Sequence, residues 1–277
     1  TGAGGTIGRA LCISIINLNP SKIILIENNE LSLYSLNEEL MALTKKDIAI
    51  IPCLINLIDL QSLENIFKKH KVDKIFHAAA YKHVPLVELN PISGIKNNVI
   101  STLNICNIAL KYKIKNIVQI SSDKAVRPTN LMGATKRICE LIFINYQKRS
   151  IIDEAGSIYS IVRFGNVLNS SGSVVPLFKK QIETGGPITL THLDVTRYFM
   201  TIPEASQLVM QAGAMGEGGE IFVQNADLHT HGVGAPDLGL GCYRNAVIVE
   251  QLAGEAVYPV DRDTVFQQFD VARFCED

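Results

Sequence analysis

The chain opens with Thr1-Gly2-Ala3-Gly4-Gly5-Thr6-Ile7-Gly8, and a helical pattern of apolar residues follows as far as Leu18. Gly2, Gly5 and Gly8 have the spacing T-G-x-x-G-x-x-G. Glycines at these positions let the backbone turn sharply and approach a pyrophosphate that lies on the helix N-terminus. The stretch therefore predicts a dinucleotide-binding turn, although the pattern alone is a weak signal.

The next segment strengthens this interpretation. Lys22-Ile-Ile-Leu-Ile26 has the pattern of a buried strand. It ends in Glu27, about 20 residues after the turn, where an acid bonds the adenosine ribose hydroxyls. The residues that follow are Asn28, Asn29 and Glu30, so no nearby Lys or Arg is available for a 2′-phosphate. The sequence therefore favours NAD over NADP.

Strand and helix patterns alternate along the rest of the first half. Helices are expected near residues 31–43, 60–70 and 91–112, and strands near residues 48–51, 74–77, 116–120 and 158–164. This β-α repeat predicts a parallel, doubly wound sheet. Such a sheet needs a strand before the glycine turn, so we expect a fragment whose first, central strand is missing. A shorter sheet that starts at the second strand is the alternative.

Polar and small residues follow the expected strands at their carboxyl ends, where ligands bind in open α/β sheets. Asn56 and Leu57 are expected beside the adenine. The strand over 74–77 is followed by three small residues that allow close approach of a cofactor, Ala78, Ala79 and Ala80. Asn98, on the following helix, is a candidate for holding a local kink and a proton-relay water. A polar residue on a helix surface is the equal alternative.

Chemistry is expected at Ser121-Ser122-Asp123-Lys124, directly after an apolar strand. A Pro-containing turn leads from there into a helix that carries Met132 and Lys136 one turn apart on the same face. Asp123, Lys124 and Lys136 would be costly to bury without a purpose. Their place at a strand end favours a catalytic role over a solvated turn with ordinary surface charges.

The bulk composition sets the class of protein. The chain has 277 residues, of which 47% are apolar, and a formal net charge of −1. These values fit a globular protein with a sizeable core and give no argument for a nucleic-acid partner or a membrane surface. The six cysteines form no C-x-x-C pair, which favours reduced thiols in the cytoplasm. No signal peptide and no run of about 18 apolar residues is visible.

The alternation changes after residue 165. We assign residues 1–165 to an NAD-binding domain and residues 166–223 to a small, interleaved substrate lobe. The lobe is expected to hold a Gly- and Ser-rich loop, a helix over 174–183, a strand near 188–191 and a further helix. Asn166 and Arg197 are candidate donors to an anionic, sugar-like ligand.

Residues 224–277 show neither a helical nor a strand period, and all 17 lysines of the chain lie within residues 1–180. This shift predicts an atypical tail, disordered or of foreign origin, such as a reading-frame change or a chimeric assembly. His229 and His231 are metal-ligand types, but no third ligand stands at a suitable spacing. We therefore expect no metal site.

Several motifs, taken together, resemble one known family. They are HAAAYKHVPLVE over 77–88, SSDKAVRPTN over 121–130, MGATKR over 132–137, RFGNV over 163–167 and RYFMTIPEA over 197–205. In these motifs the chain resembles the CapD-like polysaccharide-biosynthesis proteins, nucleotide-sugar 4,6-dehydratases of the extended short-chain dehydrogenase/reductase superfamily. The resemblance covers roughly residues 1–223 and implies a Rossmann-type fold.

The resemblance implies UDP-N-acetylglucosamine as the substrate and tightly held NAD as a recycled oxidant. Hydride would leave sugar C4, the C5 proton would be removed while the C6 hydroxyl departs as water, and the hydride would return to C6. By the family assignment, Asp123 protonates the leaving hydroxyl and Lys124 is the base at C5. Lys136 would bond the nicotinamide ribose and help to take the C4 hydroxyl proton, and Ser122 would bond the sugar.

Met132 departs from the superfamily pair Tyr-x-x-x-Lys, because a thioether cannot take a proton. From the residue alone an inactive enzyme would be expected, but the larger, membrane-anchored family members resemble this chain in carrying Met here. Proton removal would then pass to Lys136, Asp123 or a water. Met132 also suggests an intact protein that continues upstream through transmembrane helices, with this domain on the cytoplasmic side of the inner membrane.

With the resemblance included, the expected site has three groups of residues. The catalytic group is Ser122, Asp123, Lys124, Met132 and Lys136. The cofactor group is Gly2, Gly5, Thr6, Ile7, Gly8, Glu27, Asn56, Leu57, Ala78, Ala79, Ala80, Lys82, Asn98 and Lys136. The substrate group is Lys82, Asn166, Ser173, Val174 and Arg197.

Two other functions stay open at this point. A catalytically silent NAD-binding module is motivated by Met132 and by the atypical tail. A nucleotide-sugar 4-epimerase needs no base at C5, and a tyrosine at position 132 would be expected in it. Asp123 and Lys124 count against both. A homo-oligomer is also expected, since helices that flank such sheets often pair subunits.

Overall fold

The structure, a computed structural model, describes residues 1–44, 48–170, 174–189 and 199–223. The expectations for Ser173, for Arg197 and for the tail over 224–277 lie outside these residues. Val174 is described only as the first residue of a helix.

The strands form parallel pairs, as the β-α repeat predicts. Two of them, β1 (Lys22–Glu27) and β2 (Ala49–Leu54), make one parallel pair. Four others form a second sheet in the order β3-β4-β5-β8, with bounds Lys74–His77, Asn116–Ile120, Ile158–Arg163 and Ile221–Val223. The α/β fold with a parallel sheet is confirmed.

Residues 1–3 lie between the two sheets. The Thr1 nitrogen donates to the Phe76 carbonyl oxygen at 2.8 Å, and the Ala78 N–H donates to the Thr1 carbonyl at 3.1 Å. On the other side, the Ala3 N–H donates to the Ile26 carbonyl at 3.3 Å. The glycine turn therefore lies at the carboxyl edge, where the order of the strands reverses. No strand of the described chain lies between β1 and β3.

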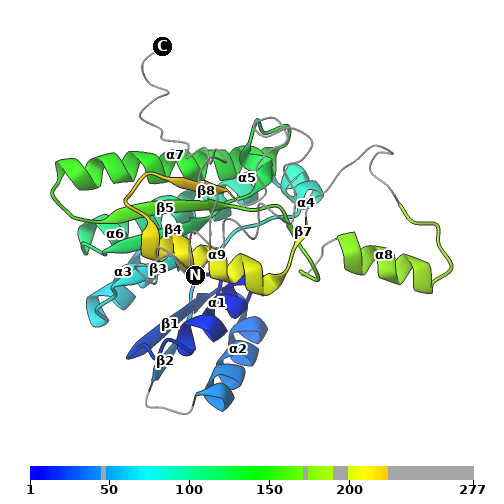
Figure 1. The fold of residues 1–277 in the computed structure, drawn as a ribbon. Helices are drawn as coiled ribbons and strands as arrows, with labels where there is room; N and C mark the ends of the chain where they lie inside the picture. The colour runs from blue at the N-terminus through cyan, green and yellow to red at the C-terminus, as the bar shows by residue number, and fades with distance from the viewer. Residues whose placement is uncertain (45–47, 171–173, 190–198, 224–277) are drawn as a thin grey trace, which may run out of the picture.

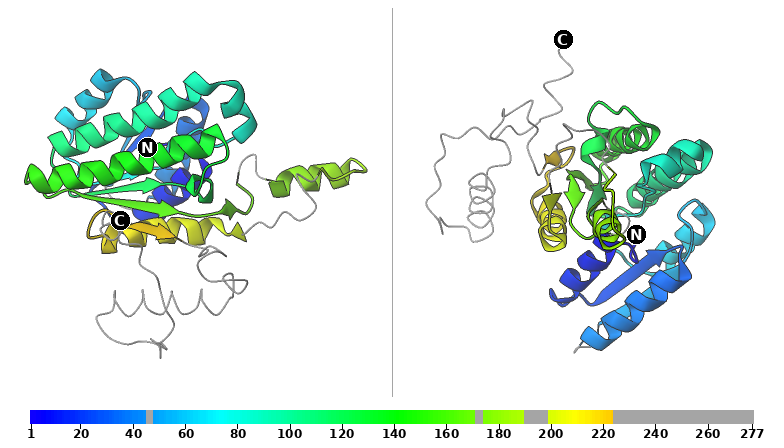
Figure 2. Two further views of the ribbon diagram at one scale, coloured as in Figure 1. Left: turned by 90° about the horizontal axis from the view of Figure 1, so that it is seen from above. Right: turned by 90° about the vertical axis from the view of Figure 1, so that its right-hand side faces the viewer.

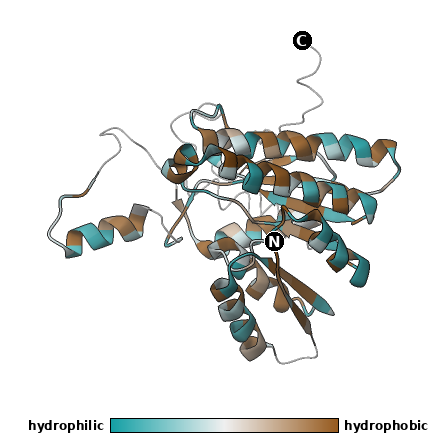
Figure 3. Cartoon of the chain, turned by 180° about the vertical axis from the view of Figure 1, so that it is seen from behind, coloured by the Kyte–Doolittle hydropathy of each residue, from teal (hydrophilic) through white to brown (hydrophobic). Residues whose placement is uncertain are grey.

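Helices cover both faces of the sheets (Figures 1 and 2). On one face, α1, α2 and α9 pack against β1, β4 and β5; their bounds are Thr6–Ile16, Glu30–Leu43 and Ile202–Met215. On the other face lie α3, α6 and α7, with bounds Leu60–Lys69, Ser101–Lys111 and Leu131–Ile152. The strands are largely apolar along their length (Figure 3), as strands covered on both faces must be. This is a doubly wound arrangement.

The helix expected over 91–112 is interrupted. A separate helix α4 (Val84–Leu89) precedes α5 (Pro91–Ile95), and a π-helical turn over Lys96–Ile100 separates α5 from α6. The apolar period runs through this region, so the sequence pattern does not reveal the π-turn. Such turns form where tertiary contacts distort a helix.

The lobe after residue 165 differs from the expectation in one strand. The helix α8 (Val174–Glu183) has the predicted bounds and lies apart from the sheet layers (Figure 1). The strand expected near 188–191 is wrong for its described residues, because the Thr189 N–H donates to the Gln181 side chain at 3.2 Å. The lobe instead contains β6 (Asn166–Val167) paired with β7 (Phe199–Met200). Both α9 and β8 belong to the main layers.

Replacing Gly2 tests the close approach at the turn. Gly2 has φ of +64°, and a Cβ there would lie 2.6 Å from the Ala79 nitrogen. We expect Gly2→Ala to lower the free energy of unfolding by about 2–5 kcal/mol, since the backbone strain and the overpacking add. Gly156→Ala is the matched control: its φ is +67° and no atom lies within 4 Å of its Cβ. Equal losses in urea unfolding would contradict the close-approach argument.

Candidate active site

The glycine turn is built so that its backbone can fold onto itself. The Gly5 N–H donates to the Gly2 carbonyl at 3.2 Å, which closes the turn directly before α1. A Cβ on Gly8 would lie 2.0 Å from the same carbonyl oxygen. Gly5 is the N-cap of α1 and has no side chain that could cover the helix N-terminus. The turn and the first turn of α1 thus form a smooth backbone surface beside the ends of β1 and β3.

A cleft of about 330 Å³ opens above this turn. It is lined by eight of the expected cofactor residues, Gly2, Gly5, Glu27, Asn56, Leu57, Ala78, Ala79 and Ala80. Six expected residues do not line it: Thr6, Ile7, Gly8, Lys82, Asn98 and Lys136. The sequence analysis missed several lining residues that neighbour the expected ones, Gly4, Asn28, Asn29, Ser32, Tyr81, Asn97 and Ser101. The cleft has the position and lining of an adenosine site at a topological switch point.

Glu27 lies at the wall of the cleft, at the end of β1. One carboxylate oxygen accepts from the Gly4 N–H at 3.0 Å. The other accepts from the N–H groups of Asn28 at 2.9 Å and Asn29 at 3.1 Å. The acid therefore ties the glycine turn to β1 at the wall of the cleft.

The expected acid and base are in direct contact at the end of β4. Lys124 Nζ lies 3.0 Å from Asp123 Oδ1, and the same oxygen accepts from Ser122 Oγ at 2.7 Å. A 3₁₀ turn over Asp123–Ala125 holds the two residues side by side. The exposed fractions are 51% for the Asp123 side chain and 32% for the Lys124 side chain, so the expectation of a costly burial does not apply to this pair. An open acid–amine pair is available to a ligand.

Lys136 and Met132 lie on the buried face of α7, as the helical spacing predicts. Lys136 Nζ donates to the Ile120 carbonyl at 2.9 Å, which brings its amine to the end of β4. Burial lowers the pKa of this amine. Met132 is buried as well, with 2% of its surface exposed. The helix and the strand end therefore bring together the residues of the expected catalytic group.

Asn98 is a buried linker rather than a surface residue. It lies in the π-helical turn with 1% of its surface exposed, so the helix-surface alternative is wrong. Its Oδ1 accepts from the Tyr81 N–H at 2.7 Å, and its Nδ2 donates to the Tyr81 carbonyl at 3.1 Å and to Thr135 Oγ1 at 2.9 Å. Asn98 thus fixes the loop after β3 against α7. Its part in a proton relay stays a prediction.

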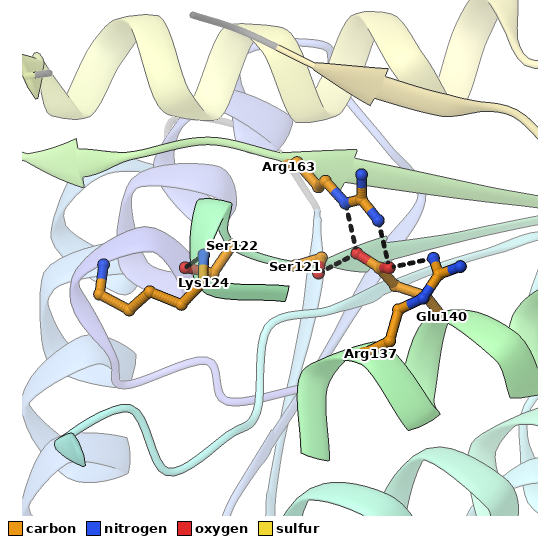
Figure 4. Close-up of polar contacts among 6 residues, drawn as sticks. All are labelled: Ser121, Ser122, Lys124, Arg137, Glu140 and Arg163. Carbon is orange, nitrogen blue, oxygen red and sulfur yellow. Dashed lines mark hydrogen bonds and ion pairs between the residues drawn. The ribbon is translucent and has the colours of Figure 1, made fainter. Parts of the chain in front are cut away.

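A buried ion cluster forms around Glu140, next to Ser121 (Figure 4). Glu140, on α7, is fully buried and accepts from Arg163 at 2.7 and 2.6 Å, from Arg137 at 2.9 Å and from Ser121 Oγ at 2.5 Å. Burial alone would raise the pKa of Glu140, but the hydrogen bonds and charges of these partners hold it below its usual value. The sequence analysis missed Glu140, which on a helix without its partners has no distinguishing signal.

The remaining expected substrate residues are less concentrated. Lys82 lies on the exposed loop after β3, where partial burial lowers the pKa of its amine. Asn166 begins β6, beyond the end of β5.

Within the described residues, no helix is long and apolar enough to cross a bilayer. In the same part of the chain, no three His, Cys, Asp or Glu side chains converge to hold a metal ion.

Comparison with known proteins identifies the family. A family model described as "Polysaccharide biosynthesis protein" matches residues 1–230. The chain belongs to this family. It is 47% identical over 223 residues to the capsular polysaccharide biosynthesis protein CapD of Staphylococcus aureus, a match that covers 80% of this chain and 37% of CapD. It is 42% identical over 224 residues to a protein of Methanocaldococcus jannaschii named an uncharacterized membrane protein, covering 80% and 64% of the two chains.

Solved structures share the fold of this chain. The dTDP-glucose 4,6-dehydratase DesIV of Streptomyces venezuelae, crystallised with NAD, has a TM-score of 0.67 at 18% identity; the match covers 80% of this chain and 73% of DesIV. Other relatives and neighbours are named UDP-glucose 4-epimerases. The Rossmann-type fold is thereby confirmed, and the expected cofactor is the one bound in DesIV. The chain spans little more than a third of the length of CapD.

The ion cluster makes a prediction about acid stability. The pKa of Glu140 is lower in the folded protein than its ordinary value of 4.5, so the charged carboxylate stabilises the fold at any pH above 4.5. This stabilisation is lost as the pH falls through the pKa that Glu140 has in the folded protein. We expect Glu140→Gln to lower the free energy of unfolding by about 3–5 kcal/mol near neutral pH and by clearly less in acid.

Urea unfolding from neutral to acidic pH measures this difference. Glu38→Gln, on the exposed surface of α2, is the matched control. A loss for Glu140→Gln that is the same at every pH would rule out the charge as its source.

Proposed function

We propose that this chain carries the active site of an NAD-dependent UDP-N-acetylglucosamine 4,6-dehydratase that serves surface polysaccharide or glycan synthesis. The observation that carries the proposal is the direct contact of Asp123 and Lys124 at the carboxyl end of β4. An acid and an amine side by side at a strand end, next to a dinucleotide-type cleft, supply the two proton transfers that a dehydration requires. Family membership and nucleotide-sugar neighbours support the same reaction class.

The residues present fit NAD. Gly2 and Gly5 line the cleft with backbone directly before the N-terminus of α1, where a pyrophosphate would lie, and Glu27 lines it at the end of β1, where it would bond the adenosine ribose. Lys136, at the end of β4, is positioned for the nicotinamide ribose. NAD, when bound, accepts a hydride from sugar C4 and returns it to C6. The residues that follow Glu27 are Asn28, Asn29 and Glu30, and the carboxylate would repel a 2′-phosphate, which supports NAD over NADP.

In the elimination step, Asp123 and Lys124 account for both proton transfers. Neutral Lys124 takes the proton from C5, protonated Asp123 gives its proton to the C6 oxygen, and the C6–O bond breaks to release water. The pair is then an ammonium and a carboxylate, the ion pair seen in the structure. One proton transfer along their 3.0 Å contact restores the neutral amine and the neutral acid.

Removal of the C4 hydroxyl proton cannot use Met132. The candidates are Lys136, Asp123 and a water molecule. Lys136 fits best, because its burial lowers the pKa of its amine and makes the neutral form easier to reach. The stereochemical outcome at C5, retention or inversion, is left open because both use the same residue types.

Two other functions are less well supported. A silent NAD-binding module would account for Met132, but it has no use for the Asp123–Lys124 contact. A 4-epimerase would fit the relatives named UDP-glucose 4-epimerases, but it needs no base at C5 and would be expected to carry a tyrosine at position 132.

We further propose that the whole protein is a homo-oligomer attached to the cytoplasmic membrane, in line with the archaeal relative named a membrane protein.

Replacing the proposed base tests the reaction. Purified protein with NAD and UDP-N-acetylglucosamine is expected to give a 4-keto-6-deoxy sugar, detected by mass spectrometry as the loss of one water. Lys124→Ala should abolish this product, since no other amine contacts Asp123 in the described structure. Lys148→Ala, an exposed lysine on α7, is the control and should retain the rate. An unchanged rate in Lys124→Ala would remove the assigned role.

Replacing Glu27 tests the cofactor assignment separately. We expect Glu27→Ala to weaken NAD binding roughly tenfold or more, because charged hydrogen bonds contribute about 1.5–3 kcal/mol. The preference for NAD over NADP should also shrink. Isothermal titration calorimetry with both dinucleotides measures this, with Glu38→Ala on exposed α2 as the control. Equal affinities for NAD and NADP in the unmodified protein would overturn the assignment.

A further inference from the structure

We propose that Ser121, held by the buried carboxylate of Glu140, is a positioning residue for the Asp123–Lys124 pair and controls the elimination step separately from the oxidation step. The inference rests on the proposed function and adds to it a residue pair behind the reacting groups. Neither residue is expected to touch the substrate. Figure 4 shows Ser121 between Ser122 and Glu140.

The Glu140 cluster joins three separate elements at one point. Ser121 follows β4, Arg163 ends β5, and Arg137 lies one helical turn before Glu140 on α7. All four hydrogen bonds to the carboxylate are between 2.5 and 2.9 Å. The exposed fractions are 0% for the Glu140 side chain and 14% for that of Arg163. Such a cluster leaves little freedom to any of its members.

Stability alone gives a weak reason for this cluster. Buried charges lose their hydration, and apolar residues of similar volume often stabilise a fold as well or better. Apolar packing does occur beside Glu140 on α7, where Phe143 is fully buried in the core. Hydrogen bonds are directional, and apolar packing is not. The contact between the buried Glu140 carboxylate and the Ser121 hydroxyl therefore indicates that the position of Ser121 has to be fixed.

Ser121, two residues before Asp123, is held by hydrogen bonds of both its backbone and its side chain. Its N–H donates to the Val162 carbonyl at 2.7 Å, and its hydroxyl donates to Glu140 at 2.5 Å. The following link is looser, with the Asp123 N–H 3.3 Å from the Phe164 carbonyl. The side-chain contacts of Ser122 and Asp123 lie within the 3₁₀ turn itself. Without the Ser121 hydroxyl contact, backbone hydrogen bonds to Val162 and Phe164 would tie this segment to β5 and the residue after it.

The oxidation step has its own anchor on the same strand. Lys136 donates to the carbonyl of Ile120, the residue before Ser121, and this contact does not involve Glu140. Removing the Ser121 hydroxyl should therefore disturb Asp123 and Lys124 while leaving Lys136 in place. The two half-reactions should respond differently, which a merely structural role would not produce.

The experiment compares Ser121→Ala with a matched control, Ser150→Ala. Ser150 is also a buried serine at the end of a hydroxyl contact, donating to the Ser157 carbonyl at 2.8 Å, but it lies near the far end of α7. Ser121→Ala loses one hydrogen bond to a charged group, and Ser150→Ala loses two neutral ones, to the carbonyl and the N–H of Ser157. Both variants should therefore melt at similarly lowered temperatures. Stopped-flow absorbance of the reduced nicotinamide follows oxidation, and mass spectrometry follows dehydration.

We expect Ser121→Ala to reduce its NAD at close to the normal rate, to accumulate reduced cofactor, and to dehydrate the sugar about 100-fold more slowly with KM nearly unchanged. Ser150→Ala should dehydrate at the normal rate. If Ser121→Ala dehydrates as fast as Ser150→Ala, or if its oxidation and dehydration slow equally, the positioning role is overturned while the proposed function stands. An unmodified protein that neither reduces NAD nor dehydrates the sugar would overturn both.

Discussion

The close contact between the glycine turn and the end of β3 is the constraint on which the rest of the structure depends. Gly2 has a positive φ and leaves no space for a side chain against Ala79. Residues 1–3 at the same time hydrogen-bond to β1 on one side and to β3 on the other. This contact joins the two sheets at their carboxyl edge, so the cleft and the strand end with Asp123 and Lys124 open on the same side of the molecule.

Sequence patterns predicted those parts of the fold whose cause is local. β3 and β4 have the expected bounds because short apolar runs between turn residues leave few alternatives. The interruption at Lys96–Ile100 was expected only as a local kink held by Asn98, and the apolar pattern did not show its π-helical form. Its cause is tertiary, because Asn98 turns inward to bond both backbone groups of Tyr81. The expected strand near 188–191 failed for a related reason, since the Gln181 side chain takes the N–H of Thr189 that a strand ladder would use.

The candidate site divides in the same way. Asp123, Lys124 and Lys136 could be predicted because polar groups at a strand end are an unusual pattern, and the structure brings them together. Glu140 could not, since a carboxylate on a helix is ordinary until Arg163 and Ser121 converge on it from other elements. Its spacing of four residues from Lys136 does place it on the same face, but the apolar pattern of α7 does not mark that face as the one that meets the strand end.

Met132 gives the arrangement at the strand end its functional meaning. In the proposed reaction the oxidation step has no phenol, so it depends on the Lys136 amine, whose pKa burial lowers. The elimination step depends on a different pair, Asp123 and Lys124, which stays open to solvent. Both steps are anchored to consecutive residues of one strand end, through the Ile120 carbonyl and the Ser121 hydroxyl. Each step therefore has its own hydrogen bond between α7 and the strand end, while the reacting groups stay adjacent.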